Sequence, residues 1–197
     1  AAWDALYRGN SDFVANVSDW MSRSDRLDSG YEVRVKRFRE IDADDFDAVD
    51  LNPATSEFDD KVSDLWWEFQ GSPTKSRVTL RDAKRRIELH PRDVGVGVSQ
   101  MLPVVVAALD KDGADIVAIE QPELHLHPAL QTRLGDLFIE SARREPQTTF
   151  ILETHSEHLI LRLLRRIRET AEAKTGTPER HPDQVSVIYA EQTDDGV

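Results

Sequence analysis

Residues 115–128 read Asp115-Ile-Val-Ala-Ile-Glu120-Gln121-Pro122-Glu123-Leu-His125-Leu-His127-Pro128. The apolar run from Asp115 to Ile119 predicts a short buried strand. Pro122 ends this strand, because proline has no amide to donate to the ladder. The strand therefore delivers Glu120 to its open end, where a carboxylate suits a hydrated magnesium ion beside a phosphate. An apolar strand that ends in an acid is common in α/β proteins, but the His-x-His-Pro that follows makes this string more specific.

Alternating strands and helices surround this string. We expect strands at 115–119, 148–152 and 185–189, and helices at 99–109, 128–144 and 154–173. The short connections between them indicate an α/β fold with a mostly parallel sheet flanked by helices. In such sheets ligands bind at the carboxyl ends of the strands. The polar clusters of this sequence fall at those ends.

A second polar cluster, Glu153-Thr154-His155-Ser156-Glu157-His158, follows the strand at 148–152. Because neighbouring parallel strands end at one edge of a sheet, we expect His155 at the same edge as Glu120. A histidine after a strand is by itself more often structural, and the first cluster tips the balance toward a functional role. Thr154 and Glu157 fit a capping box at the start of the helix over 154–173.

The helix over 154–173 has an apolar face and a basic one. Its arginines are expected to point outward: Arg162, Arg165, Arg166 and Arg168. A solvated helix face explains such a row better than nucleic-acid contact does.

A third cluster lies at residues 91–100, where Gly95 and Gly97 lead into a helix that opens with Ser99 and Gln100. Backbone amides, a hydroxyl and the positive end of the helix dipole together favour an anion such as phosphate. Two glycines before a helix are also common in plain tight turns, so this cluster is weak by itself.

The first part of the chain, residues 1–76, carries no such motif. Apolar spacing predicts a helix over 11–22, and alternation predicts a strand over 31–38, while a strand pair at 77–80 and 86–89 opens the second part, 77–197. Aspartates crowd residues 40–60, which indicates a solvated acidic loop more than a site for a cation or a basic partner. We expect Trp66 and Trp67 to pack at a junction between subdomains.

Composition narrows the class of protein. The 197 residues carry a formal net charge of −12, which disfavours a stand-alone nucleic-acid clamp. There is no cysteine, so disulfide scaffolds and thiolate metal sites are excluded. No apolar run approaches membrane-spanning length and no signal peptide is evident, so we expect a cytoplasmic location and no membrane contact. Both ends suggest a segment of a larger protein.

The three clusters, in this order and spacing, resemble the C-terminal half of an ABC-type ATPase domain. The subgroup they resemble is that of bacterial AAA-family ATPases related to the SMC, RecF and overcoming-lysogenisation-defect (OLD) proteins. In this resemblance residues 92–103 occupy the signature region, Ile116 to Gln121 are the Walker B strand, Glu123 to Pro128 form the dimer-facing loop, and His155 is the switch histidine. The strong similarity covers about residues 92–166.

The resemblance implies a P-loop NTPase fold in which a homodimer sandwiches two ATP molecules. Glu120 would hold Mg²⁺ through water, and His155 would contact the γ-phosphate. Gly95, Gly97, Ser99 and Gln100 would reach the ATP bound to the opposite subunit. Relatives often couple ATP to a nuclease or toxin effector or to DNA, in phage defence or DNA maintenance.

Two departures from the family pattern affect these expectations. No G-x-x-x-x-G-K-[ST] string occurs, and the lookalike at residues 71–76 lacks the second glycine, so the phosphate cradle must lie outside this chain, which alone should be inactive. Gln121 stands where most of the superfamily has the glutamate that activates water. An amide cannot accept a proton but can orient water, and Glu123 is a candidate helper.

Two other classes stay open. A zinc or two-metal hydrolase could use a cluster of acids and histidines: Glu120, His125, His127, Glu153, His155 and His158. A degenerate, non-catalytic ATPase lobe used for assembly would also explain Gln121 and the missing cradle.

Overall fold

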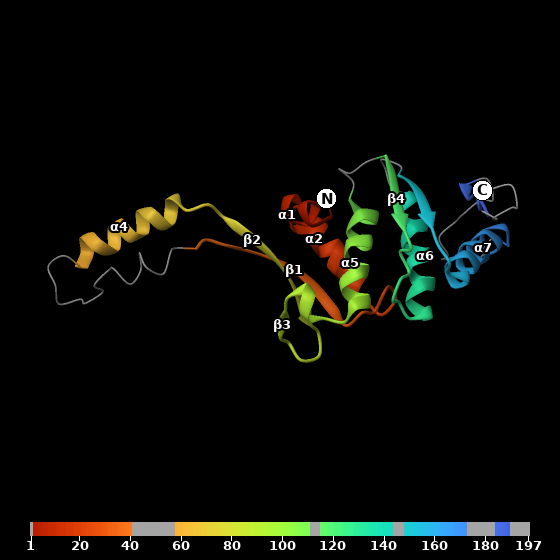
Figure 1. Cartoon of the computed structure of the whole chain (residues 1–197), viewed down its shortest axis with the longest axis horizontal. Helices are drawn as coiled ribbons and strands as arrows, with labels where there is room; N and C mark the ends of the chain where they lie inside the picture. Colours follow the sequence, from red (N-terminus) through yellow and green to blue (C-terminus); the bar gives the residue numbers. More distant parts are fainter. Residues whose placement is uncertain (1, 41–57, 111–114, 144–147, 173–183, 190–197) are drawn as a thin grey trace, which may run out of the picture.

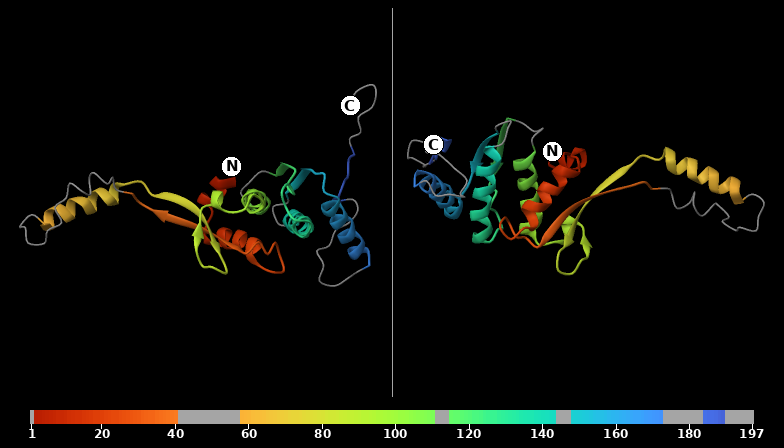
Figure 2. Two further views of the ribbon diagram at one scale, coloured as in Figure 1. Left: turned by 60° about the horizontal axis from the view of Figure 1, so that its bottom comes forward. Right: turned by 180° about the vertical axis from the view of Figure 1, so that it is seen from behind.

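The computed structural model describes residues 2–40, 58–110, 115–143, 148–172 and 184–189 (Figure 1). Two helices and an antiparallel sheet form one part of the body, and helices around a two-stranded parallel sheet form the other. A narrow arm leaves the antiparallel sheet and carries a helix at its far end (Figures 1 and 2). The chain is thus a mixed α/β protein, as the sequence predicted.

The N-terminal helices α1 (Ala2–Arg8) and α2 (Ser11–Ser22) pack beside the sheet. Asn10 caps α2, because its side-chain oxygen accepts a hydrogen bond from the backbone N–H of Phe13 at 2.8 Å. The buried face of α2 carries Val17, Trp20 and Met21. The helix predicted over 11–22 is confirmed.

The antiparallel sheet consists of β1 (Tyr31–Phe38), β2 (Lys75–Asp82) and β3 (Glu88–Leu89), in that order. The β1–β2 register runs from Tyr31 opposite Asp82 to Phe38 opposite Lys75. Because side chains alternate along a strand, Val33, Val78 and Leu80 lie on one face and enter the core. The other face is polar. The predicted strand over 31–38 and the strand pair that follows are both confirmed.

The arm ends in α4 (Phe58–Gly71), which projects beyond the far ends of β1 and β2 (Figure 1). Trp66 and Trp67 lie on α4 and are 57% and 71% exposed. Their predicted packing at a junction between subdomains is therefore wrong, since no layer of the body covers this helix. The predicted acidic loop falls mostly on residues 41–57, which lie outside the described residues.

The second part of the body contains a short 3-10 helix, three α-helices and two strands, in this order: η1 (Pro91–Asp93), α5 (Val96–Leu109), β4 (Ile116–Glu120), α6 (Pro128–Ala142), β5 (Thr149–Glu153) and α7 (Glu157–Ala171). β4 and β5 pair in parallel, with Ile116 opposite Thr149 and Glu120 opposite Glu153. The fully buried residues Met101, Leu102 and Val105 place α5 in the core between the two parts.

The starts of two helices differ from the sequence prediction. α5 begins at Val96, because Gly95 already acts as its N-cap. α7 begins at Glu157, because Ser156 is the N-cap and its hydroxyl accepts a hydrogen bond from the N–H of Leu159 at 3.0 Å. The hydroxyl of Thr154 instead accepts from the N–H of Ser156, so the predicted capping box is wrong.

Residues 185–189 were expected to form a third strand and do not. They pair with no strand among the described residues, and Ile188 is 90% exposed. An apolar run forms a stable strand only when a neighbouring strand accepts its hydrogen bonds. The parallel sheet that the structure describes therefore has two strands.

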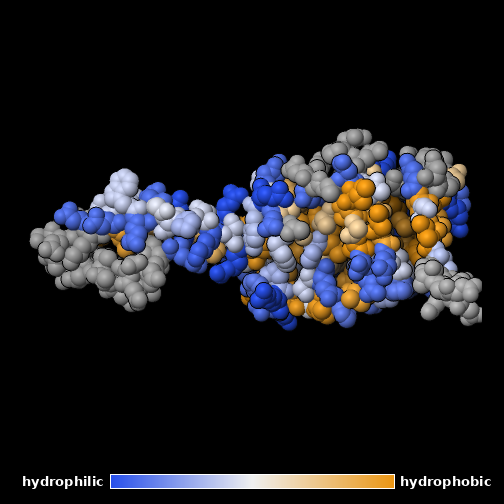
Figure 3. All heavy atoms as spheres, turned by 45° about the horizontal axis from the view of Figure 1, so that its top comes forward, coloured by the Kyte–Doolittle hydropathy of each residue, from blue (hydrophilic) through white to orange (hydrophobic). Residues whose placement is uncertain are grey.

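One face of this sheet is open. Ile116 and Ile151 are 58% and 59% exposed, while the alternate residues Val117, Ile119 and Leu152 turn toward the helices. Figure 3 shows hydrophobic residues gathered over this part of the body.

Candidate functional site

Two carboxylates end the parallel strands. Glu120 and Glu153 are Cα partners in the last position of the ladder, and both are exposed. Directly after them the backbone N–H of Gln121 donates to the carbonyl of Glu153 at 2.8 Å, which extends the contact by one residue. The predicted edge, where polar residues follow two neighbouring strands, is therefore real.

The loop that follows β4 turns sharply. Gln121 and His125 have positive φ angles of 46° and 61°, which residues with a side chain rarely adopt. Two backbone hydrogen bonds of 3.0 Å, from Leu124 to Gln121 and from Leu126 to Glu123, hold the turns. Asp28 and Arg86 adopt the same region elsewhere, so these angles show a sharp turn at residues that the sequence singled out.

Glu123 is buried beneath this edge, with 8% of its surface exposed. Its Oε1 accepts a hydrogen bond from the backbone N–H of His155 at 2.9 Å. Its Oε2 is buried and has no partner among the described residues. The carboxylate therefore fixes the loop after β5 to the loop after β4, and it is buried, whereas Glu120 and Glu153 at the strand ends are exposed.

Gln131 and Ser156 complete this connection. The Ser156 hydroxyl donates to Gln131 Oε1 at 2.7 Å, and Gln131 Nε2 donates to the carbonyl of Leu126 at 2.9 Å. Two loops and two helix starts are thus joined around His155, whose side chain remains exposed. The sequence analysis did not identify Gln131. Its position one turn after the His127 cap of α6 was the available signal.

The start of α5 lies against the same loop. A Cβ on Gly97 would come within 2.7 Å of the carbonyl oxygen of His125, so only glycine permits this approach. Gly95 has open space around it. Ser99 is half-buried and its hydroxyl donates to the carbonyl of Val96 at 2.9 Å, while Gln100 is exposed.

The structure thus brings the predicted residues together in two contacts. Glu123 meets His155, and Gly97 meets the loop that follows Glu120 and Gln121. No hydrogen bond between described residues joins Ser99 or Gln100 to the strand ends. The glycine-containing lookalike at residues 71–76 lies on the arm, where α4 ends, and takes no part in this site (Figure 1).

The arginines of α7 divide into two pairs. Arg162 and Arg166 are largely buried and share Asp136 of α6, with Nε–Oδ1 distances of 3.0 and 2.7 Å. Their predicted outward orientation is wrong, because an acid on the neighbouring helix holds them. Arg165 and Arg168 are exposed as predicted.

Glu169 completes this ion-pair network. Arg165 and Arg166 both donate to its carboxylate, at 2.8 and 2.7 Å. The hydrogen bond from Arg165, followed by that from Arg166, holds the pKa of Glu169 below its ordinary value against the opposing effect of burial. For Arg166, burial opposes the charged form, but Asp136 and Glu169 outweigh it and raise the pKa of the guanidinium.

The described residues give no support for a metal site formed by protein side chains alone. Nowhere in the described part of the chain do three histidine or acidic side chains gather as ligands. His127 is engaged in capping α6, since its Nδ1 accepts from the N–H of Ala129 at 3.3 Å. The described residues therefore offer no site for the zinc or two-metal hydrolase alternative.

Comparison with known proteins identifies the family. Residues 2–162 match the family model described as "AAA domain, putative AbiEii toxin, Type IV TA system". The chain belongs to this AAA domain family. The match confirms the resemblance to ABC-type AAA ATPases that the sequence motifs indicated, and with it the nucleotide-binding character of the domain. None of the curated proteins compared matches the chain.

Solved structures with a similar arrangement are SMC heads. One is the SmcHead bound to the C-winged helix domain of ScpA, at 15% identity and a TM-score of 0.47, covering 77% of this chain and 36% of that one. Another is the Smc head domain from Pyrococcus furiosus with an extended coiled coil, bound to the C-terminal domain of ScpA. It has 14% identity and a TM-score of 0.47, and the match covers 77% of this chain and 30% of that one. A third comes from work on ATP-driven dimerization and DNA stimulated activation of SMC ATPases. It has 14% identity and a TM-score of 0.45, and the match covers 77% of this chain and 72% of that one.

The chain therefore spans about a third of the length of the first two of these structures. Within the described residues, none of the helices combines the length and the apolar character needed to cross a bilayer.

Proposed function

We propose that this chain supplies the signature, Walker B and switch-histidine half of an ATP-driven switch that works as a nucleotide-sandwich homodimer. The observation that carries the proposal is the shared edge of β4 and β5. There Glu120 and Glu153 end paired strands, and Glu123 holds the backbone of His155 beside them. Carboxylate oxygens at such an edge suit the Mg²⁺ of MgATP, and in this proposal the imidazole beside them reaches the γ-phosphate.

The carboxylates at this edge suit Mg²⁺ bound together with phosphate oxygens. Glu120 is assigned to the metal, through water, because it is exposed at the strand end where the sequence places the Walker B acid. Magnesium keeps several waters and takes only one or two carboxylates from a protein. Bound MgATP would supply the phosphoanhydride bond to be hydrolysed, and its Mg²⁺ would neutralise negative charge on the phosphates.

Gln121 is assigned the role of orienting the water that attacks the γ-phosphate. Its amide orients a nucleophile but takes no proton, which predicts slow turnover. Glu123 is assigned a positioning role, because its carboxylate is buried and bonded to the N–H of His155. His155 is then the residue that contacts the γ-phosphate.

The signature glycines complete the partner's site. Gly95 lies in open space at the N-cap of α5, and Gly97 seats the helix start on the loop after β4. Amides at a helix start attract anions, so Gly95, Gly97, Ser99 and Gln100 face the nucleotide of the second protomer in this proposal.

The phosphate-binding loop is assigned to polypeptide outside these 197 residues. The open sheet face with Ile116 and Ile151, together with the exposed run at 185–189, is the surface that such a segment would cover. Coupling to a nuclease or toxin effector or to DNA, a role in phage defence or DNA maintenance and a cytoplasmic location are proposed from the resemblance alone.

ATP turnover by the intact parent protein tests the assignment. Glu120→Gln and His155→Ala should each lower kcat at least about a hundredfold, the scale of removing a group that stabilises the transition state. Glu157→Gln and His158→Ala are matched controls, because both residues are exposed on the first turn of α7. Turnover that responds to neither test variant would end the catalytic assignment.

Gln121 itself favours one second candidate, a non-catalytic lobe that binds nucleotide for assembly. Gln121→Glu separates the two. It should speed turnover in a slow ATPase by supplying a base, whereas a lobe that only binds ATP would show no turnover with either residue.

A further inference from the structure

The two ends of the arm carry opposite charge. At the far end, α4 (Phe58–Gly71) contains four acidic residues and one lysine. The strands and turns at the base of the arm, residues 31–40 and 75–93, contain eleven lysines or arginines and five acidic residues. A strongly basic sheet is thus built into a protein whose net charge is −12.

The acidic end presents an aromatic side chain. Trp67 on α4 is 71% exposed. Asp60 and Asp64 precede it by seven and three residues, so they share its face of the helix, and both are exposed. A helix of 14 residues is only marginally stable without tertiary packing, and exposed tryptophans of this kind anchor interfaces. This face of α4 therefore suits a contact with another protein.

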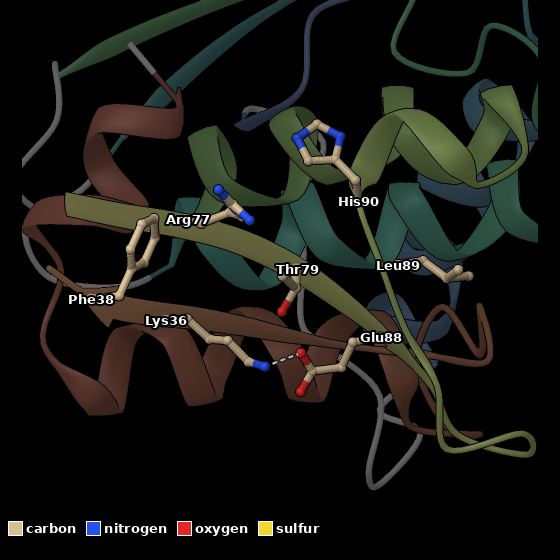
Figure 4. Close-up of a pocket in the computed structure, with 7 residues that line it drawn as sticks. All are labelled: Lys36, Phe38, Arg77, Thr79, Glu88, Leu89 and His90. Atoms are coloured by element: carbon tan, nitrogen blue, oxygen red, sulfur yellow. Dashed lines mark ion pairs between the residues drawn. The ribbon is translucent and has the colours of Figure 1, made fainter. Parts of the chain in front are cut away.

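The basic end presents a pocket for such a side chain. A cavity of about 300 Å³ opens on the polar face of the antiparallel sheet and is lined by Phe38, Arg77, Thr79, Leu89 and others (Figure 4). This volume is at the lower end of ligand sites and suits a single large side chain. The Thr79 hydroxyl is buried there and has no partner among the described residues.

Arg77 is the charged group that remains available in this pocket. Lys36 is paired with Glu88, whereas Arg77 has no carboxylate partner in the described part of the chain (Figure 4). Its guanidinium lies 4.9 Å from the centre of the Phe38 ring. The opposite face of a guanidinium in this position can stack an indole, and its charge attracts neighbouring carboxylates.

Within one chain the two surfaces lie apart along the arm, and among the described residues α4 contacts the end of β1 through Arg39, which donates to the carbonyls of Phe69 and Gln70. α4, which carries Trp67, extends away from the body and lies beyond the ends of β1 and β2 (Figures 1 and 2). Two α4 helices would also repel each other, since both are acidic. The complementary surface must come from another molecule.

We propose that α4 of one copy docks on the polar face of the antiparallel sheet of a second copy. Trp67 enters the Phe38–Arg77 pocket, and Asp60 and Asp64 lie against its basic rim. The contact is reciprocal, so the two arms cross about a two-fold axis and the assembly closes as a dimer. Two identical contacts reinforce each other, because the second forms within an already joined pair.

Sedimentation velocity of the 197-residue chain over a range of concentrations tests the proposal. A species of twice the 22.4 kDa monomer mass should form, and raising the salt from about 50 mM to about 0.5 M should weaken it, because exposed charges are screened. Trp67→Ser, Asp64→Arg and Arg77→Glu should each raise the dissociation constant about tenfold or more. Trp3→Ser and Asp12→Arg make the same changes at exposed positions of α1 and α2 and should have no effect.

Mixing two variants gives the deciding result. Asp64→Arg and Arg77→Glu each break both contacts of a homodimer. An equimolar mixture should dimerise again. In the heterodimer, α4 with Asp64→Arg meets the pocket with Arg77→Glu, and the unchanged α4 meets the unchanged pocket. Circular dichroism of each variant checks that it is folded.

Three outcomes would overturn the proposal: a wild-type chain that stays monomeric, association that ignores all three substitutions, or a mixture that stays dissociated. A 20-nucleotide single strand serves as a competing probe. If it binds the monomer and loses affinity in Arg77→Glu while no dimer forms, the pocket belongs to nucleic acid instead.

Discussion

The carboxylate of Glu123 accepts a hydrogen bond from the backbone N–H of His155 at 2.9 Å, 32 residues along the chain. This bond joins the loops that follow β4 and β5. The bond fixes the position of the His155 backbone, while the His155 side chain stays exposed. The other loop contacts, through Gln131 and Ser156, depend on the same alignment.

Glu123→Ala should destabilise the chain by about 1–3 kcal/mol, because the part-buried N–H of His155 loses its acceptor. Glu123→Gln keeps an acceptor oxygen and should cost less. Denaturant unfolding gives the stability, and hydrogen exchange at the His155 amide reports the bond itself. Equal protection of this amide in wild type and Glu123→Ala would show that the bond does not form.

Gly97→Ala should destabilise the chain by about 1–3 kcal/mol, since the new methyl group meets the carbonyl oxygen of His125 and backbone must move. Gly95→Ala is the matched control, because nothing lies within 4 Å of its Cβ position, and it should cost no more than about 1 kcal/mol. Thermal or urea unfolding of both variants measures the difference. Equal stabilities would mean that α5 does not seat on this loop.

Asp136→Ala should cost about 3 kcal/mol, because it leaves the largely buried Arg162 without its acid and weakens the hold on Arg166. Asp25→Ala removes an exposed acid paired with Arg23 and should cost under about 1 kcal/mol. Urea unfolding at neutral pH compares the two. A cost for Asp136→Ala no greater than that of the control would show that the α6–α7 ion pairs add nothing to stability.

Glu169 should make stability depend on pH in the acid range. Its pKa is lowered in the folded protein, so the unfolded chain takes up its proton first as the pH falls. Its contribution is complete above the ordinary glutamate pKa and is lost as the pH falls through the lowered folded value. The difference in unfolding free energy between wild type and Glu169→Gln should therefore be largest near neutral pH and shrink toward acid, and a constant difference would contradict this.

The parallel strands and their polar ends could be predicted because two local signals agree there. Apolar runs of about five residues between helical segments favour strands, and the acids and histidine that follow them then lie where the strands end. This placed Glu120 and His155 at one edge before any contact was known. The role of Glu123 could not be predicted, because its partner is a backbone amide distant in sequence, and no side-chain pattern identifies such a partner.

The errors also have physical causes. Thr154 and Ser156 are both good caps, and only the path of the chain after β5 decides which hydroxyl faces the helix amides. Arg162 and Arg166 lie on a helix whose periodicity suggested solvent, but Asp136 on a neighbouring helix draws them inward. Trp66 and Trp67 are large enough to suggest burial, yet the arm carries them away from the body.

The arm also has a mechanical consequence. Its strands are anchored at one end by Val33, Val78 and Leu80 in the core, and α4 lies at the free end. The strand beyond Val35, which lies opposite Val78, and the 14 helical residues placed end to end reach about 30 Å at the usual rise of each element. Over such a lever, a tilt of about 5° at the sheet moves the tip by about 3 Å. A small rotation of the sheet that leaves the packing at its base intact therefore moves α4 by enough to change its contacts with a neighbouring molecule.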